Sequence, residues 1–178
     1  MIAIRISQDS FYLDRSHFAP GRRALLNFDH PRAIDWKLFE KALRKCAARE
    51  RFSVPCYDFE THSRKASESV FESARLVVVE GLWIFRSAAI RALFSTKIFI
   101  RAPQHLCVKR RLERDMRERG RTREQVMRQL ERHTMPMFER FVAPQERWAD
   151  VILEAPVSDV EVSQLRNRIA ENLCAFGI

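Results

Sequence analysis

Two acidic residues follow segments of the sequence that have the pattern of β-strands. Asp9 comes soon after the apolar segment Ile2–Ile6, and Glu80 directly follows the continuous apolar run Leu76–Val79. Carboxylates at the ends of two neighbouring strands can bind Mg²⁺ through water, and one of them can accept a proton from a substrate hydroxyl. The alternative is that Asp9 caps a turn or helix and that Glu80 is an ordinary edge carboxylate. The spacing alone leaves both interpretations open.

Basic residues are concentrated in one short segment. The chain has a formal net charge of +9, and the segment Lys109–Arg123 alone carries more than half of that excess. Nearly all of its basic residues are arginines, whose planar guanidinium groups can bind phosphate oxygens with two hydrogen bonds each. An anionic partner is therefore expected. Taken alone, a charge run of this kind favours a solvated helix face, with ion pairs such as Glu113–Arg117 four residues apart.

The elements that would hold these residues alternate between strands and helices. The run Leu76–Val79 is too short for a helix, and its unbroken apolar character predicts a strand buried on both faces. Such alternation is typical of an α/β fold with a parallel sheet, in which ligands bind beyond the carboxyl ends of the strands. The remaining predicted strands are Ile2–Ile6, Lys97–Ile100 and Val151–Leu153, and the predicted helices are Asp35–Arg49, His105–Arg119, a segment from Thr122 and a segment from Asp159.

Local signals place the ends of the helices. Asp35 precedes an apolar periodicity and can cap its first turn, and Gly120 stands where a helix commonly ends in the left-handed conformation. Thr122 and Gln125 have the spacing of a capping box, which predicts a new helix directly after that turn. Pro136 is expected to kink or break this second helix.

Composition limits the kind of protein. The 178 residues, 46% of them hydrophobic, include no linker-like stretch, so we expect a single domain over 1–178. No apolar run reaches the eighteen or so residues that a membrane span needs. The four cysteines lie far apart, which argues against a metal cluster and a disulfide framework and for a reducing, cytoplasmic location.

Six sequence blocks, taken in order, resemble the uridine kinase (uridine–cytidine kinase) family of P-loop phosphotransferases over nearly the whole chain. The blocks Asn27–Pro31 and Pro55–Arg64, which contain Asn-Phe-Asp-His-Pro and Tyr-Asp-Phe with His-Ser-Arg, are the most specific. They favour this family over phosphoribulokinase and pantothenate kinase. The other blocks are Ser7–Tyr12, Val77–Gly81, Arg114–Arg121 and Trp148–Ile152. The resemblance implies a three-layer parallel sheet with helices on both faces, as in P-loop NTPases and nucleoside kinases.

The resemblance also implies roles for individual residues. Asp9 matches the base that accepts the proton of the ribose 5′-hydroxyl, and Glu80, with Asp9, would hold Mg²⁺ through water. Asp29 matches the residue that binds the ribose hydroxyls. The pyrimidine would be read by Tyr57 and His62. The remaining substrate-contact positions are Tyr12, Phe59, Arg111 and Gln129.

The arginine segment corresponds in this family to a lid, here 105–135, that closes over the nucleotide. Arg114, Arg119 and Arg121 would bind phosphates, and Arg114 and Arg119 would also neutralise charge during transfer. With the resemblance, phosphate binding becomes the preferred interpretation of the segment, and Arg110, Arg117 and Arg123 are expected to be surface residues. The implied partners are a nucleoside, ATP or GTP, Mg²⁺ and further copies of the chain. Membrane and nucleic-acid partners are not expected.

One part of the family pattern is missing from these 178 residues. The family's first strand and its G-x-x-x-x-G-K-[ST] loop, the Walker A motif, would precede Ser7, and the sequence contains no such loop. That strand would lie between Leu76–Glu80 and Lys97–Ile100, so its absence should leave two strand edges unpaired or force them together. We expect the natural protein to begin about thirty residues earlier. The alternatives are a relative without the loop that binds nucleosides or nucleic acid, and a kinase of another small alcohol.

Overall fold

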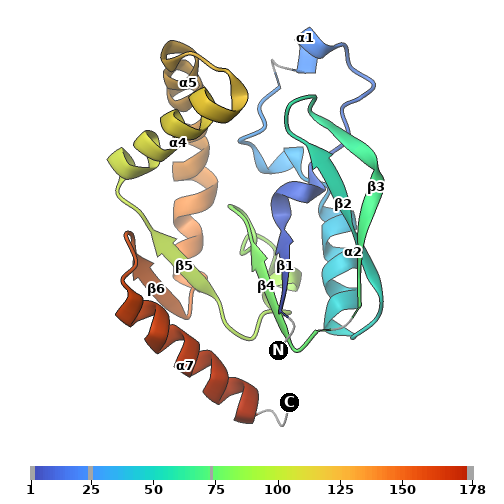
Figure 1. Cartoon of the computed structure of the whole chain (residues 1–178), viewed down its shortest axis with the longest axis vertical. Helices are drawn as coiled ribbons and strands as arrows, with labels where there is room; N and C mark the ends of the chain where they lie inside the picture. Colours follow the sequence, from blue (N-terminus) through green and yellow to red (C-terminus); the bar gives the residue numbers. More distant parts are fainter. Residues whose placement is uncertain (1–2, 24–25, 73, 176–178) are drawn as a thin grey trace.

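The computed structural model describes residues 3–23, 26–72 and 74–175, and its strands form pairs. Two pairs are parallel, as the alternation of strands and helices predicted. Strand β1 (Ala3–Ser7) pairs with β4 (Leu76–Glu80), and β5 (Ile98–Arg101) pairs with β6 (Val151–Glu154) (Figure 1). All four strands lie within a residue or two of the segments predicted, although Ile2 lies outside the described residues. The predicted α/β class with parallel strands is confirmed.

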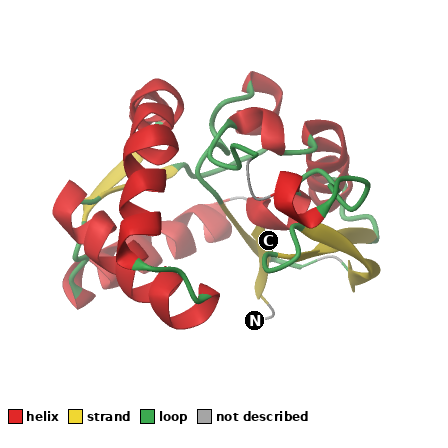
Figure 2. Ribbon diagram, turned by 90° about the horizontal axis from the view of Figure 1, so that it is seen from above, coloured by secondary structure: helices red, strands yellow, loops and turns green. Residues whose placement is uncertain are grey.

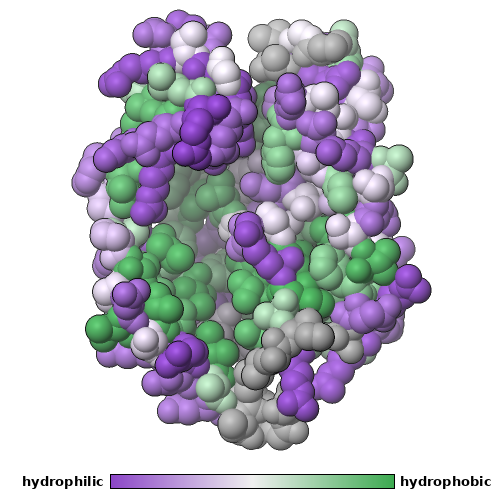
Figure 3. Space-filling model, in the orientation of Figure 1, coloured by the Kyte–Doolittle hydropathy of each residue, from purple (hydrophilic) through white to green (hydrophobic). Residues whose placement is uncertain are grey.

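The two parallel pairs are not joined into one sheet within the described part of the chain. There β4 is hydrogen-bonded only to β1, and β5 only to β6. The prediction that β4 is buried on both faces was wrong, because Val78 at its centre is 50% exposed. With no strand on its second side among the described residues, β4 leaves this side chain uncovered. Figure 3 shows apolar surface over the middle of the molecule, where Figure 1 places β4 and β5.

A third pair of strands was not predicted. Strands β2 (Phe52–Asp58) and β3 (Ser63–Phe71) form an antiparallel hairpin, with an irregular register between Pro55 and Tyr57. Seen from above in Figure 2, this hairpin lies on one side of the molecule, and the β5–β6 pair with its helices lies on the other. The hairpin therefore lies across the molecule from the arginine-rich segment predicted as the helix His105–Arg119 (Figure 1).

The helices begin and end where the local signals placed them. The Oδ1 atom of Asp35 accepts a hydrogen bond from Leu38 N at 3.1 Å, and Gly120 adopts φ 61° at the end of the long helix. Thr122 and Gln125 make both bonds of the capping box. The helices are α1 (Pro20–Arg23), α2 (Trp36–Ala47), α3 (Ala88–Arg91), α4 (Gln104–Arg119), α5 (Arg123–Gln129), α6 (Met135–Met137) and α7 (Asp159–Ala175).

The chain stays helical through Pro136 instead of breaking there. Wide π-helical turns at Leu130–Thr134 and Phe138–Val142 lie on either side of α6, and a 3₁₀ segment, Ala143–Trp148, completes the run. Proline has no N–H to donate, and a wider turn accommodates such a residue within a helix. The expected interruption is thus a change of hydrogen-bonding pattern.

The hydrophobic core lies beneath the ends of β1 and β4. Ile6, Phe11, Phe39, Trp83 and Ile90 are almost fully buried and belong to one cluster. They come from β1, the turn after it, α2, the loop after β4 and α3, so the core fixes the loops that follow both strands. No helix in the described part of the chain combines the length and apolar character that a membrane span requires.

Candidate active site

The carboxyl ends of β1 and β4 lie side by side. Ser7 is paired in register with Glu80, and the next residues form a 3₁₀ turn, Gln8–Phe11, that contains Asp9. The buried Gln8 accepts a hydrogen bond from Trp83 N at 3.0 Å, which ties this turn to the loop after β4. The contact depends on Gly81, since a Cβ atom there would lie 2.4 Å from Gln8 Cβ.

Asp9 is the most strongly buried carboxyl group at these strand ends. Burial raises its pKa above the ordinary value of an aspartate, and the negative charge of Glu80 raises it further. The positive charges of Arg114 and Arg119 act in the opposite direction. Glu80 is more exposed and forms an ion pair with Arg5 at 3.1 Å. The two carboxylates are therefore close enough to interact, although only one is buried.

A second carboxylate, Asp29, is held by three side chains. Thr134 Oγ1 donates to its Oδ2 at 3.0 Å, Gln129 Nε2 donates at 3.5 Å, and Arg111 lies 3.4 Å from Oδ1. Asp29 and Arg111 are mostly buried, with 15% and 16% of their side chains exposed. Thr134 was missed by sequence reasoning, because it lies in a π-helical turn that no sequence signal predicted.

Aromatic side chains form a group between the hairpin and the loop that carries Asp29. The ring of His62 stacks on Phe28 with centroids 4.2 Å apart and planes 11° from parallel. The ring of Tyr57 lies 5.2 Å from Tyr12 and 5.3 Å from Phe59. Phe28 was not singled out in the sequence, although it stands next to Asp29 in the Asn27–Pro31 block. Its position next to Asp29, the residue expected to bind the ribose, was the available signal.

The polar atoms of this aromatic group differ in how they are satisfied. Tyr12 donates its hydroxyl to Phe28 O at 3.2 Å, whereas the buried hydroxyl of Tyr57 has no hydrogen-bond partner among the described residues. Burial raises the pKa of Tyr57 to about 12, so its proton remains available to donate. Burial, followed by the positive charges of Arg121 and Arg119, lowers the pKa of His62. His62 is therefore neutral near pH 7 and can either donate or accept a hydrogen bond.

The arginines of the predicted lid surround one carboxylate. Asp115 has no exposed surface, and Arg114 lies 2.8 Å from it, Arg121 3.4 Å and Arg119 3.5 Å. Arg119 also lies over the ring of Phe59, 5.9 Å from its centroid, so the cluster borders the aromatic group. The predicted Glu113–Arg117 pair is not the one formed, because Arg117 pairs with Glu118 at 2.5 Å. Arg117 thus pairs with the residue next to it in the sequence and not with Glu113, one helical turn before it.

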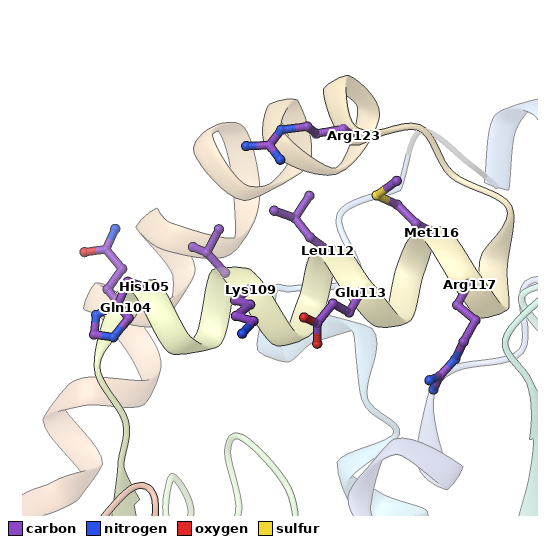
Figure 4. Close-up of a pocket in the computed structure, with 9 residues that line it drawn as sticks. Gln104, His105, Lys109, Leu112, Glu113, Met116, Arg117 and Arg123 are labelled. Carbon is purple, nitrogen blue, oxygen red and sulfur yellow. The ribbon is translucent and has the colours of Figure 1, made fainter.

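A separate groove runs along another side of α4 (Figure 4). None of the predicted site residues lines it. Its lining includes Val108, Leu112 and Met116 from α4 and Arg123 from α5. Arg117 also lines it, so this residue and Arg123 lie at the surface, away from the carboxylates. The helix α4 therefore presents its Asp115 side to the carboxylates and a different side to this groove.

Contacts and charge interactions connect the residues that the sequence predicted for the site. Asp9 interacts with Glu80, Asp29, Arg114 and Arg119, and Tyr12 interacts with Asp9 and Tyr57. The structure thus gathers the strand ends, the aromatic group and the lid arginines in one region. The residues brought together are Asp9, Tyr12, Asp29, Tyr57, Phe59, His62, Glu80, Arg111, Arg114, Arg119, Arg121 and Gln129.

Comparisons with known proteins agree with one another. The profile of the family described as "Phosphoribulokinase / Uridine kinase family" matches residues 5–163. A uridine kinase of Shewanella baltica is 35% identical over 148 residues, covering 83% of this chain and 70% of that protein. One of Tolumonas auensis is 33% identical over 165 residues, covering 92% of this chain and 77% of that protein.

Solved structures resemble the fold at lower identity. A phosphoribulokinase of Rhodobacter spheroides superposes with a TM-score of 0.66 at 22% identity, over 85% of this chain and 60% of the other. A structure titled as a possible uridine kinase of Bacillus stearothermophilus gives 0.57 at 13% identity, over 85% of this chain and 71% of the other. The chain thus spans less than two thirds of the phosphoribulokinase, and at these identities the likeness concerns the fold alone.

Proposed function

The chain belongs to the phosphoribulokinase/uridine kinase family of phosphotransferases, and we propose that it acts in transferring the γ-phosphoryl group of ATP or GTP to the 5′-hydroxyl of uridine or cytidine. The similarity to uridine kinases over most of the chain supports a nucleoside as the acceptor. The observation that carries the proposal is the half-buried carboxylate of Asp9, which interacts with a second carboxylate and with an aromatic group.

In this proposal Asp9 accepts the proton of the attacking hydroxyl. The 5′-oxygen forms a bond to the γ-phosphorus, the bond from that phosphorus to the β–γ bridging oxygen breaks, and the proton moves to a carboxylate oxygen of Asp9. Because the transition state of phosphoryl transfer is loose, orienting the hydroxyl is the larger part of this task. The 3₁₀ turn Gln8–Phe11, tied to the loop after β4 through the buried Gln8, holds Asp9 in position for this task.

Asp29 and the aromatic residues would bind the nucleoside. A carboxylate can accept hydrogen bonds from two ribose hydroxyls, and Thr134, Gln129 and Arg111 hold Asp29 in place for this role. Tyr57 has a buried hydroxyl that no described residue occupies, so it can donate to the ligand. His62 can donate to a uracil oxygen or, in its other tautomer, accept from a cytosine amine. Tyr12 and Phe59, whose rings lie beside that of Tyr57, would contact the base.

Arg114, Arg119 and Arg121 would neutralise the phosphates. Mg²⁺ commonly binds one or two carboxylates, water and substrate phosphates, and the interacting carboxylates of Asp9 and Glu80 fit that donor set. No group of three or more candidate ligands occurs among the described residues. When bound, the metal would offset negative charge on the transferring phosphates. The 178 residues contain no Walker A motif, so the proposal assigns none of them to the β-phosphate.

Calorimetric titration of this chain with uridine and cytidine tests the acceptor site. We expect both to bind and Tyr57→Ala and His62→Ala to weaken binding at least tenfold, the effect of about one lost hydrogen bond together with stacking. His105→Ala, at an exposed position of α4, is the matched control and should bind normally.

Other results of the titration would replace the proposal. Binding of pantothenate or ribulose 5-phosphate in place of uridine would make the acceptor another small alcohol. Failure of uridine and cytidine to bind, together with RNA binding that weakens steeply as salt rises, would instead indicate a nucleic-acid-binding protein.

A further inference from the structure

The side chain of Asp115 is fully buried beneath arginines, and the proposed mechanism does not use it. Four guanidinium groups lie within 4 Å of this one carboxylate. Four positive side chains therefore surround this one negative side chain. The arginines are Arg111 (3.7 Å), Arg114 (2.8 Å), Arg119 (3.5 Å) and Arg121 (3.4 Å).

The local fold explains how four arginines reach one carboxylate. Arg111 and Arg119 lie one turn before and one turn after Asp115 on α4, the spacing at which helical side chains meet. Arg121 lies beyond the end of the helix. The left-handed Gly120 turns the chain back, and Arg121 N donates to Asp115 O at 3.2 Å, which brings its side chain to the same carboxylate.

The carboxylate and the arginines differ in their access to solvent. Asp115 has none, whereas the side chain of Arg114 is 46% exposed and that of Arg121 26% exposed. A carboxylate offers about four acceptor positions and each guanidinium has five donors, so most of the donors remain free after contact with Asp115. Arg111 and Arg121 also bond to Asp29 and Gln129, and Arg114, the most exposed of the four, offers its remaining donors to a second, larger anion on the outer side of the cluster.

The cluster is also connected to the proposed ribose site. Arg111 contacts both Asp115 and Asp29, and Arg121 Nη1 donates to Gln129 Oε1 at 2.5 Å while Gln129 Nε2 donates to Asp29. Two routes of direct contact therefore run from the buried carboxylate to Asp29. An arginine that moved away from Asp115 would lose its place relative to the acceptor site as well.

We propose that Asp115 is a positioning residue that holds the lid arginines in an arrangement ready to bind a polyphosphate. This inference rests on the phosphate-binding role given to the arginines under the proposed function. Long side chains lose conformational freedom when they bind a ligand, and holding them beforehand removes much of that cost. The carboxylate does this at the expense of one unit of positive charge, so ordering and net charge have opposite effects on anion affinity.

Because ordering and net charge act in opposite directions, the direction of the change in anion affinity on substitution of Asp115 distinguishes them. In Asp115→Asn the net positive charge of the cluster rises, so a role limited to charge balance predicts tighter binding of inorganic tripolyphosphate. A positioning role predicts weaker binding, by roughly tenfold, the scale of one charge-assisted hydrogen bond. Isothermal titration calorimetry of the whole chain at fixed ionic strength measures the difference. Glu118→Gln is the matched control, because it removes one negative charge from the same helix at an exposed site.

The expected result is weaker tripolyphosphate binding in Asp115→Asn and equal or slightly tighter binding in Glu118→Gln. Equal or tighter binding in Asp115→Asn would overturn the inference and leave the proposed function intact. If the unmodified chain binds no tripolyphosphate but binds uridine, the phosphate role of the arginines is wrong, and the inference fails with it. If uridine does not bind but the tripolyphosphate result is as expected, only the nucleoside assignment fails.

A second measurement decides the question if Asp115→Asn does not fold. In nuclear magnetic resonance spectra of the unmodified chain, the Nε–Hε groups of Arg114, Arg119 and Arg121 should exchange with water more slowly than that of Arg123. Arg123 is an exposed arginine outside the cluster and serves as the internal reference. Equal exchange rates for all four would show that the arginines are not held, and would overturn the inference.

Discussion

The carboxyl group of Asp9 is half-buried just after β1, and its pKa is raised first by desolvation and then by the charge of Glu80. A carboxyl with a raised pKa binds more protons in the folded state than in the unfolded state between the ordinary value and the raised one. The free energy of unfolding therefore falls as pH rises through that interval, and the full cost is present above the raised pKa. A base that must be ionised to act thus destabilises the fold that holds it.

Asp9→Asn should consequently have opposite effects on activity and stability. Loss of the base should lower phosphoryl transfer by roughly 10²- to 10⁴-fold in any form of the enzyme that binds a donor. The urea midpoint at pH 7 should rise, since the buried charge is gone. Asp14→Asn is the control, because hydrogen bonding from Ser16 lowers the pKa of Asp14 and its removal should lower the midpoint. A lower midpoint in Asp9→Asn would contradict the argument.

The two tyrosines of the aromatic group differ in their hydroxyls. The hydroxyl of Tyr57 is buried without a partner among the described residues, and that of Tyr12 donates to Phe28 O. Removing an unpaired buried hydroxyl relieves a desolvation cost, whereas removing a bonded one leaves a carbonyl without its donor. We expect Tyr57→Phe to raise the free energy of unfolding by about 1 kcal/mol and Tyr12→Phe to lower it by about 1 kcal/mol.

For Tyr57→Phe, the effect on ligand binding should be opposite to the effect on stability. If its hydroxyl serves the pyrimidine, Tyr57→Phe should weaken uridine binding by about tenfold while it stabilises the free chain. Chemical denaturation and calorimetry on the same samples measure both effects. Stabilisation without loss of uridine affinity would show that the hydroxyl does not contact the base.

Single residues were easier to predict from the sequence than their contacts. Asp9, Asp29 and Glu80 stand in sequence blocks that a resemblance can match one residue at a time. The bond from Thr134 to Asp29 joins residues 105 positions apart through a π-helical turn, and no local pattern encodes it. The same holds for the meeting of four arginines at Asp115, where the charge run was visible but its buried centre was not.

At the scale of elements, the turn after β1 and the loop after β4 are joined where Gln8 passes Gly81. A Cβ atom at position 81 would lie 2.4 Å from Gln8 Cβ, so Gly81→Ala must push the two segments apart. We expect the free energy of unfolding to fall by about 2 kcal/mol. Because Asp9 follows Gln8 directly, the displacement should also reduce phosphoryl transfer.

Gly21→Ala is the matched control for this substitution. No atom lies within 4 Å of the position a Cβ would take at Gly21, and alanine is favoured over glycine in a helix such as α1, so the free energy of unfolding should stay the same or rise by up to about 1 kcal/mol. Chemical denaturation of both variants measures the difference. Equal stability of Gly81→Ala and the unmodified chain would show that the two segments are not in close contact.

Helix ends were predictable because their signals are local. Asp35, Gly120 and Thr122 each act on backbone groups within a few residues, and all three do so as expected. The hairpin was missed because the residues of β3 are mostly polar and mostly exposed on both faces. The sequence of β3 therefore shows no alternation of apolar and polar residues. The burial of β4 was overestimated because the number of neighbours of a strand depends on the rest of the sheet.

At the scale of the whole molecule, the described residues leave apolar side chains exposed on the parallel strands and directly after β4. Val78, Leu82, Ile100 and Ile152 are each between 43% and 58% exposed, and strands β4 and β5 each have a hydrogen-bonded neighbour on one side only. Unpaired strand edges with exposed apolar side chains promote association between chains. A substitution at an exposed strand residue distinguishes association through these strand edges from a homo-oligomer formed through another surface.

We expect this chain to associate increasingly with concentration, and Ile100→Lys to reduce that association. Ile100 lies on β5 and is 58% exposed, so a lysine there adds charge beside the open edge without disturbing the core. Val160→Lys is the control: Val160 is 65% exposed but lies on the helix α7 and not on a strand. Sedimentation velocity over a range of concentrations should show less association for Ile100→Lys and no change for Val160→Lys. Equal reductions in both variants would mean that added charge, and not the strand edge, governs association, whereas no reduction in either would place the contact between chains elsewhere on the molecule.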